Sequence, residues 1–125
     1  MKKIIKTQKS PMPIGPYNQA VYVNDTLYIS GQIPVDPATN ELVKESVEAE
    51  ARQVLENLKG VLEEAGMDFS HIVKTSIFIT DMQNFAAVNK VYAEYFTSDF
   101  PARETIAVAG LPLGVNVEIS AIAVK

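Results

Sequence analysis

The sequence contains no cysteine and only one histidine, His71, and these two scarcities exclude whole classes of chemistry. Without cysteine the chain forms no disulfide, no thiolate metal site and no cysteine nucleophile. A single histidine also argues against a zinc cluster or a Ser-His-Asp triad. His71 directly precedes an apolar run, and we interpret it as a surface residue that opens a strand. We therefore expect no metal site and no catalysis by a cysteine nucleophile or a Ser-His-Asp triad.

Basic residues are also scarce, and long apolar runs are missing. Lysine and arginine number 11 against 15 aspartates and glutamates, which gives a net charge of −4. Nucleic-acid binding proteins carry clustered basic residues, and no such cluster occurs, so nucleic-acid binding is disfavoured. No stretch approaches the roughly 20 apolar residues of a membrane span, and "MKKIIKTQK" lacks a signal-peptide core. These features predict a soluble, cytoplasmic protein that does not bind membranes.

The 125 residues, 47% of them hydrophobic, predict a single domain over 1–125 with a substantial core. Residues 10–19 carry three prolines and a glycine, which indicates a stiff irregular loop. Two strands, 20–24 and 26–33, separated by the turn signal Asn24-Asp25, predict a hairpin, and 34–42 is interpreted as a second loop.

Two segments show helical periodicity. The first begins at Ser46 and ends before Gly66, and the second runs from about Asn84 to Phe96. On the polar face of the first helix, Arg52 has Glu48 and Glu56 four residues to either side. We interpret this spacing as an exposed ion-pair ladder within that helix.

Further strands are expected at 3–7, at 72–80 (with Val73, Ile77 and Ile79 on one face), around 104–109 and at 115–124. The order β-β-β-α-β-α-β-β predicts an α+β fold. It is a two-layer sandwich, a mixed sheet with both helices on one face, because right-handed crossovers place them together. The short Gly-Pro turn before the last strand leads us to expect that strand beside strand 104–109.

The last strand has one uniformly apolar face and one divided face. Along the divided face stand Asn116, Glu118, Ser120, Ile122 and Val124. A face that turns from polar to apolar in mid-strand is not simple solvent surface. Tyr28 and Phe78 lie on the same uncovered side of the sheet. Because the chain has no third layer, we expect another subunit to bury Ile122 and Val124.

Arg103 and Glu118 form the strongest chemical pair. The sequence has only two arginines, and surface ion pairing accounts for Arg52 but not for Arg103. A guanidinium grips a carboxylate or phosphate through two parallel hydrogen bonds. Two interpretations stay open: a ligand-binding arginine, or a structural salt bridge between Arg103 and Glu118, which at a surface contributes about 0 to 1 kcal/mol.

Four other residues are weaker candidates. Ser30 and Gly31 lie within a strand, where a glycine suggests a close approach to a neighbour or a ligand. Tyr17 sits in the stiff loop, either as a packing aromatic or as part of a site. Asn89 falls on the apolar stripe of the second helix, where its amide needs partners from a nearby loop or from a ligand. No G-x-S-x-G elbow or phosphate-binding glycine loop is present.

Five motifs, in order and spacing, carry a resemblance to a known family: "GPYNQA", "YISGQIP", "VNKVYAEYF", "FPARET" and "VEISAIAV". Together they resemble the Rid family (YjgF-like reactive-intermediate deaminases) from about Ile5 to Lys125. Arg103, which follows Pro-Ala, resembles the arginine that distinguishes the enamine/imine deaminase branch of the family. The resemblance implies a chorismate-mutase-like fold and a homotrimer with three active sites in clefts between subunits.

Carried over by position, the resemblance implies that Arg103 binds the substrate carboxylate. It implies that Glu118 positions or protonates groups around the attacking water. The cleft would be lined by Tyr17, Ser30, Gly31 and Asn89. The family often has cysteine where this chain has Thr105, so Thr105 offers only its hydroxyl or backbone. The family also has a small residue where this chain has Glu104, which bears on the charge of the pocket.

The implied activity is that of a 2-iminobutanoate/2-iminopropanoate deaminase. Such an enzyme hydrolyses the imines of 2-aminoacrylate and 2-aminocrotonate to 2-keto acids and ammonia without a cofactor, because an imine is already electrophilic. A carboxylate-binding regulatory or chaperone-like trimer without turnover is the alternative. RNA cleavage, a label of some family members, is disfavoured by the acidic composition. The sequence leaves the preferred imine side chain and the protected pathway open.

Overall fold

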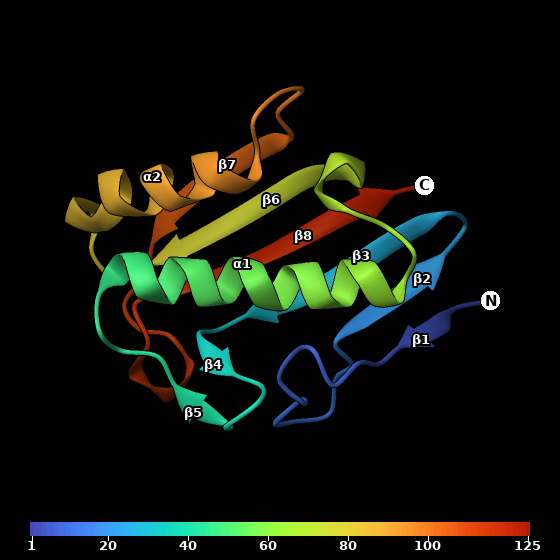
Figure 1. Ribbon diagram of the computed structural model, residues 1–125, viewed down its shortest axis with the longest axis horizontal. Coiled ribbons are helices and arrows are strands. Elements are labelled where there is room, and N and C mark those ends of the chain that lie inside the picture. Colours follow the sequence, from blue (N-terminus) through green and yellow to red (C-terminus); the bar gives the residue numbers. More distant parts are fainter.

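Two α-helices lie across one face of a six-stranded sheet in the computed structural model, which describes residues 1–125 (Figure 1). The strands are β1 (Lys3–Ile5), β2 (Ala20–Val23), β3 (Thr26–Gln32), β4 (Val35–Asp36), β5 (Glu41–Leu42), β6 (Ile72–Ile79), β7 (Ala102–Ala107) and β8 (Val117–Val124). The helices are α1 (Val47–Glu64) and α2 (Phe85–Tyr95), and short 3-10 turns occur at Phe69–His71, Met82–Asn84 and Pro112–Gly114.

The sheet is mixed, with strand order β1-β2-β3-β8-β6-β7. Only β6 and β7 run parallel, and every other neighbouring pair is antiparallel. Both helices cover the same face, as the contacts of α1 with α2, β3 and β8 require. The predicted α+β two-layer sandwich is therefore confirmed.

The prediction that the last strand lies beside strand 104–109 is wrong, because β6 lies between β7 and β8. The physical reason is the burial that each strand needs. The inner face of β8 is completely apolar and buried, so β8 requires partners on both edges and a helix above it. β7 is exposed along most of its length and carries Arg103 and Glu104, which suits an edge position.

The ends of the helices follow the predicted signals. The Oγ of Ser46 accepts a hydrogen bond from the Ala49 N–H at 3.0 Å and caps the start of α1. Gly66, with φ of +73°, ends the helix in the left-handed region that favours glycine. The second helix begins and ends within a residue of the predicted limits.

The predicted ion-pair ladder on α1 is not formed. Arg52 instead pairs with Glu94 on α2, through both of its terminal nitrogens. Glu56 accepts a hydrogen bond from the Tyr95 hydroxyl at 2.7 Å. The side-by-side packing of α1 and α2 brings these partners closer than residues on the same helix. The polar face of α1 therefore links the two helices.

Two local predictions also need correction. Val73 is 48% exposed, because the β6–β8 register shifts between Ile72 and Lys74 and places Ile72 in the core instead. The segment 34–42, expected to be a plain loop, contains the β4–β5 hairpin, in which Val35 pairs with Leu42. His71 lies just before β6, and its Nδ1 accepts a hydrogen bond from the Asp68 N–H at 3.0 Å.

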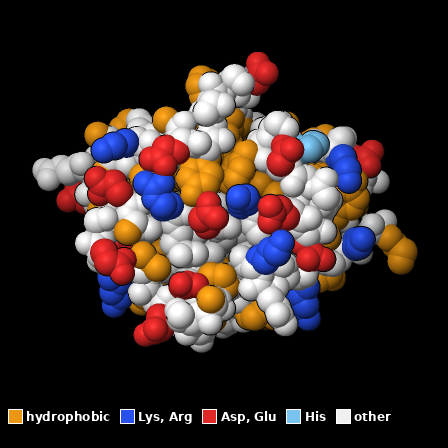
Figure 2. Space-filling view, in the orientation of Figure 1, with side chains coloured by type: hydrophobic (Ala, Val, Ile, Leu, Met, Phe, Trp, Pro, Cys, Tyr) orange, Lys and Arg blue, Asp and Glu red, His pale blue; other side chains and the backbone are white.

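A single cluster of 22 buried residues fills the space between the sheet and the helices. The opposite face of the sheet has no cover within the chain. On it the exposed fractions of Tyr28, Ile106 and Val124 are 49%, 45% and 40%. Figure 2 shows acidic and basic side chains interspersed over the helix-covered face, where no basic area gathers. Neither helix has the length and apolar character needed to cross a membrane.

Candidate functional site

Arg103 lies on edge strand β7 and points to the helix-covered side of the sheet. Its Cζ is 4.9 Å from the ring centroid of Tyr92 and 5.7 Å from that of Phe85. Attraction to the two ring faces holds the guanidinium while leaving its N–H groups available. Arg103 takes part in none of the chain's salt bridges. The structural ion pair between Arg103 and Glu118, left open by the sequence, is therefore absent within the chain.

Tyr92 is the main support of this arginine. Its hydroxyl shares a hydrogen bond of 2.9 Å with Thr75, which is fully buried and pairs with Arg103 in the β6–β7 register. Burial raises the pKa of Tyr92, while the Thr75 hydrogen bond and the charge of Arg103 act in the opposite direction. The phenol therefore stays neutral near pH 7, and its ring stays fixed under the guanidinium.

An open depression of about 390 Å³ lies beside Arg103. Its walls are formed by Asn89, Tyr92, Ala93, Phe96, Phe100, Pro101 and Arg103. Arg103 is the only charged residue of this wall, so the depression suits a small anion such as a carboxylate. Thr105 lies two residues after Arg103 on the same face of β7, and its buried Oγ1 has no hydrogen-bond partner. Arg103, Asn89 and Thr105 thus form one group, which we call the arginine cluster.

Glu118 stands on the uncovered face of the sheet, against Gly31. A Cβ built on Gly31 would lie 2.7 Å from the Cδ of Glu118, so only glycine leaves room for this carboxylate. The close approach predicted from a glycine within a strand is confirmed, and the neighbour is Glu118. Ser30 and Gly31 occupy an irregularity in the β3–β8 register. Burial raises the pKa of the Glu118 carboxyl.

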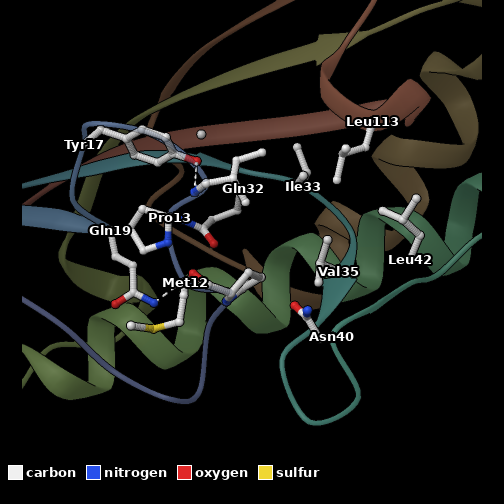
Figure 3. A pocket seen from close by; sticks show the side chains of 13 residues that line it. Met12, Pro13, Tyr17, Gln19, Gln32, Ile33, Val35, Asn40, Leu42 and Leu113 are labelled. Atoms are coloured by element: carbon white, nitrogen blue, oxygen red, sulfur yellow. Dashed lines mark hydrogen bonds between the residues drawn. The ribbon is translucent and has the colours of Figure 1, made fainter.

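The loop before β2 completes this second group. The Ser30 hydroxyl donates to the Asn18 carbonyl at 2.6 Å, which ties the loop to β3. Tyr17 is 48% exposed and lies outside the hydrophobic core, and its ring packs over Gly15 of its own loop, so both interpretations of this residue stay open. Tyr17 and Gly31 both line a cavity of about 170 Å³ (Figure 3). Glu118, Gly31, Ser30 and Tyr17 form what we call the glutamate cluster.

Glu50 is a supporting residue that the sequence reasoning missed. This buried carboxylate of α1 accepts hydrogen bonds from the backbone N–H of Asn116 at 2.8 Å and from its Nδ2 at 2.7 Å. The Oδ1 of Asn116 in turn accepts from the Thr80 hydroxyl at 3.0 Å. Asn116 precedes Glu118 by two residues, so this network fixes the start of β8. An acidic residue in the first turn of a helix was the only signal, and it is also typical of exposed helix ends.

The two clusters do not meet within one chain. In the strand register Arg103 lies opposite Thr75, and both face the helices, whereas Glu118 lies opposite Phe78, and both face the uncovered side. Strand β6 also separates β7, which carries Arg103, from β8, which carries Glu118. The sequence-based expectation that β7 and β8 bring them together is therefore wrong. No group of three or more histidine, aspartate or glutamate side chains is arranged to hold a metal ion.

Comparisons with known proteins agree over the whole fold. A sequence model of the family described as Endoribonuclease L-PSP matches residues 7–125. The chain is 50% identical to the 2-iminobutanoate/2-iminopropanoate deaminase of Bos taurus, covering 100% of this chain and 91% of that protein.

Solved structures show the same fold. A protein of the conserved Rid family from Yersinia pestis, described as of unknown function, is 48% identical with a TM-score of 0.97, covering all of both chains. E. coli TdcF with bound serine is 44% identical with a TM-score of 0.94, covering 98% of each. The chain, with its arginine after Pro-Ala on an edge strand and its glutamate against a strand glycine, belongs to the Rid (YjgF/RutC) family.

Proposed function

We propose that the protein hydrolyses 2-imino acids to 2-keto acids and ammonia. The observation that carries the proposal is Arg103, a guanidinium held over two aromatic rings with no carboxylate partner in the chain. An arginine presented in this way recognises a planar anion such as the carboxylate of an imino acid. The 50% identity to the Bos taurus deaminase supports the same substrate class.

In this proposal the arginine cluster binds and the glutamate cluster reacts. Arg103 grips the substrate carboxylate, and Asn89 and Thr105 offer polar groups beside it. Water adds to the imine carbon, and the Glu118 carboxylate accepts the proton that this water loses. Glu118 returns this proton to the nitrogen, which gives a carbinolamine. The proton of the new hydroxyl group then passes through Glu118 to the nitrogen as well, so that the C–N bond breaks, the C=O bond forms, and ammonia and a 2-keto acid are released. Fixing the reactants in place and transferring the proton both lower the barrier, the latter by about 10²- to 10⁴-fold.

The site is completed between copies of the chain. Because the clusters lie on opposite faces of the sheet, one substrate reaches both only where two subunits meet. The exposed apolar side chains on the uncovered face, among them Tyr28 and Ile106, support burial of that face by another copy. We propose a homotrimer with three such sites, as the family resemblance implies.

A second candidate function is carboxylate binding without turnover. It is favoured by E. coli TdcF, whose structure contains serine, a stable amino acid carboxylate. The same Arg103 would bind such a ligand, and the protein would then act as a regulatory or chaperone-like module. RNA cleavage, suggested by the family description, has less support because acidic residues outnumber basic ones.

A coupled assay tests the proposal. A pyridoxal-phosphate-dependent serine or threonine dehydratase generates the enamine, and keto-acid release is followed before spontaneous hydrolysis is complete. We expect the protein to accelerate keto-acid release and the Arg103→Ala variant not to do so. Equal rates with and without the protein, together with carboxylate binding by calorimetry, would favour the binding module. Cleavage of an RNA oligonucleotide without imine hydrolysis would favour the nuclease.

A further inference from the structure

The cavity that Tyr17 and Gly31 of the glutamate cluster line continues between apolar walls to which the proposed chemistry assigns no role. Three separate segments contribute apolar side chains to it: the loop before β2, the stretch from β3 to β5, and the turn before β8 (Figure 3). The apolar contributors are Pro11, Met12, Pro13, Ile14, Ile33, Val35, Leu42 and Leu113. Met12, Ile14 and Leu113 are each more than half exposed, which leaves apolar surface available to a ligand.

Most of the amide groups that Gln19 and Gln32 contribute to the wall are bonded within the protein, and the other amide side chain of the wall is that of Asn40. The amide of buried Gln19 accepts from the Thr7 N–H and donates to the carbonyls of Thr7, Ser10 and Pro11, at 2.8 to 3.0 Å. The Gln32 amide nitrogen donates to the Ser30 carbonyl at 3.1 Å. A ligand in this cavity therefore gains little from polar groups, and burial of its own apolar surface dominates its binding.

The cavity lies next to the proposed reacting group. Gly31 lines the cavity, and it is also the residue against which the Glu118 carboxylate packs. If the carboxylate of a 2-imino acid is held by Arg103 and its imine carbon by Glu118, only its side chain remains to be placed. We infer that this cavity receives the side chain of the substrate, an inference that rests on the proposed function.

The size of the cavity indicates the class of side chain. An apolar cavity of about 150 Å³ accommodates a benzene molecule, so the 170 Å³ here fits an aliphatic or thioether chain as large as that of leucine or methionine. Burial of each additional methylene raises affinity by roughly fourfold. The protein should therefore prefer the imine of leucine over 2-iminopropanoate, which differs by three carbons, by on the order of 50-fold in kcat/KM.

A variant that fills the cavity, compared with a matched control variant, tests this inference. Leu42→Trp places an indole into the cavity from β5, whereas Glu41→Trp places the same group on the exposed neighbouring position of that strand. An amino acid oxidase generates the imines of leucine and alanine within the assay mixture. We expect Leu42→Trp to lower the ratio of kcat/KM for the leucine imine to that for 2-iminopropanoate by at least about tenfold. Glu41→Trp should leave the ratio unchanged.

A second filling variant guards against misfolding of the first. Ile14→Trp enters from the opposite wall at a loop position that is 68% exposed, and it should lower the same ratio. An unchanged ratio in a folded filling variant, or a wild-type protein without chain-length preference, would overturn the side-chain site while leaving the deaminase intact. If the wild type accelerates hydrolysis of neither imine, the proposed function itself fails, and the inference with it.

Discussion

Replacing Gly31 with alanine is a selective way to move the Glu118 carboxylate. The new Cβ would lie 2.7 Å from the Cδ of Glu118, and ordinary contacts begin at about 3.4 Å. The carboxyl carbon must therefore retreat by about 0.7 Å, and the nearer oxygen, Oε2, by more, or the group must rotate away. Because the clash involves the end of a flexible side chain and not the backbone, the fold can absorb it. The φ angle of Gly31 is outside the left-handed region, so alanine fits the backbone.

The displacement should reduce activity far more than stability. A misplacement of about 1 Å in a reacting group costs on the order of 100-fold in rate, so we expect kcat for 2-iminopropanoate to fall by roughly 30- to 100-fold. The loss of unfolded-state freedom from Gly31→Ala is worth about 0.4 to 1 kcal/mol in favour of the folded state, which offsets the side-chain rearrangement. The free energy of unfolding should therefore change by less than about 1 kcal/mol.

The dehydratase-coupled assay and chemical denaturation measure the two quantities. In a Glu118→Gln background the alanine should add little further loss, because the group that it displaces no longer transfers a proton. Full activity in Gly31→Ala, with a structure that shows Glu118 displaced, would refute the proposed role of Glu118. A large loss of stability would show instead that Gly31 serves the fold.

Four further predictions follow from the same structure. Arg103→Ala should lower kcat/KM by at least 100-fold and Arg103→Lys should recover little, whereas Arg52→Ala, which removes only a surface pair, should leave activity unchanged. Glu50→Ala leaves the amide donors of Asn116 without partners, and urea titration should show a loss of about 1 to 3 kcal/mol; no loss would contradict the network. The folded chain binds the Glu118 proton more tightly than the unfolded chain, so the stability contributed by this group declines as pH rises through its raised pKa. Glu118→Gln should abolish that decline in the free energy of unfolding, and a decline of the same size in the variant would refute the assignment. Light scattering should give about three copies of the 13.7 kDa chain, and a stable monomer would contradict the shared site.

The parts of the fold that depend on local sequence patterns, such as the ends of the helices, were predictable. Ser46 and Gly66 mark the ends of α1 through capping and backbone conformation, which are properties of a few neighbouring residues. The position of β8 was not predictable in this way, because a short turn permits a strand to pair with the preceding one or to cross to another partner. That choice depends on burial across the whole sheet. Val73 was misassigned because the sequence alternation continues through a bulge that only strand register reveals.

The site was predictable in its residue types but not in its arrangement. The glycine at position 31 indicated a close approach, and the structure supplies Glu118 as the neighbour. Tyr92 reads as an ordinary core aromatic on the stripe of α2. Its support of Arg103 arises only because β7 turns that arginine toward the helix. Arg52 similarly found its partner on the other helix, since packing of distant segments decides which charges meet.

Mixing two inactive variants tests the central claim most directly. In Arg103→Ala chains the glutamate cluster is intact, and in Glu118→Gln chains the arginine cluster is intact. If each site takes one cluster from each of two copies, random assembly of equal amounts after refolding restores about a quarter of the sites. We predict recovery of about a quarter of the wild-type imine deaminase activity in the mixture, against almost none in either variant alone. A mixture as inactive as its components would contradict a site shared between subunits.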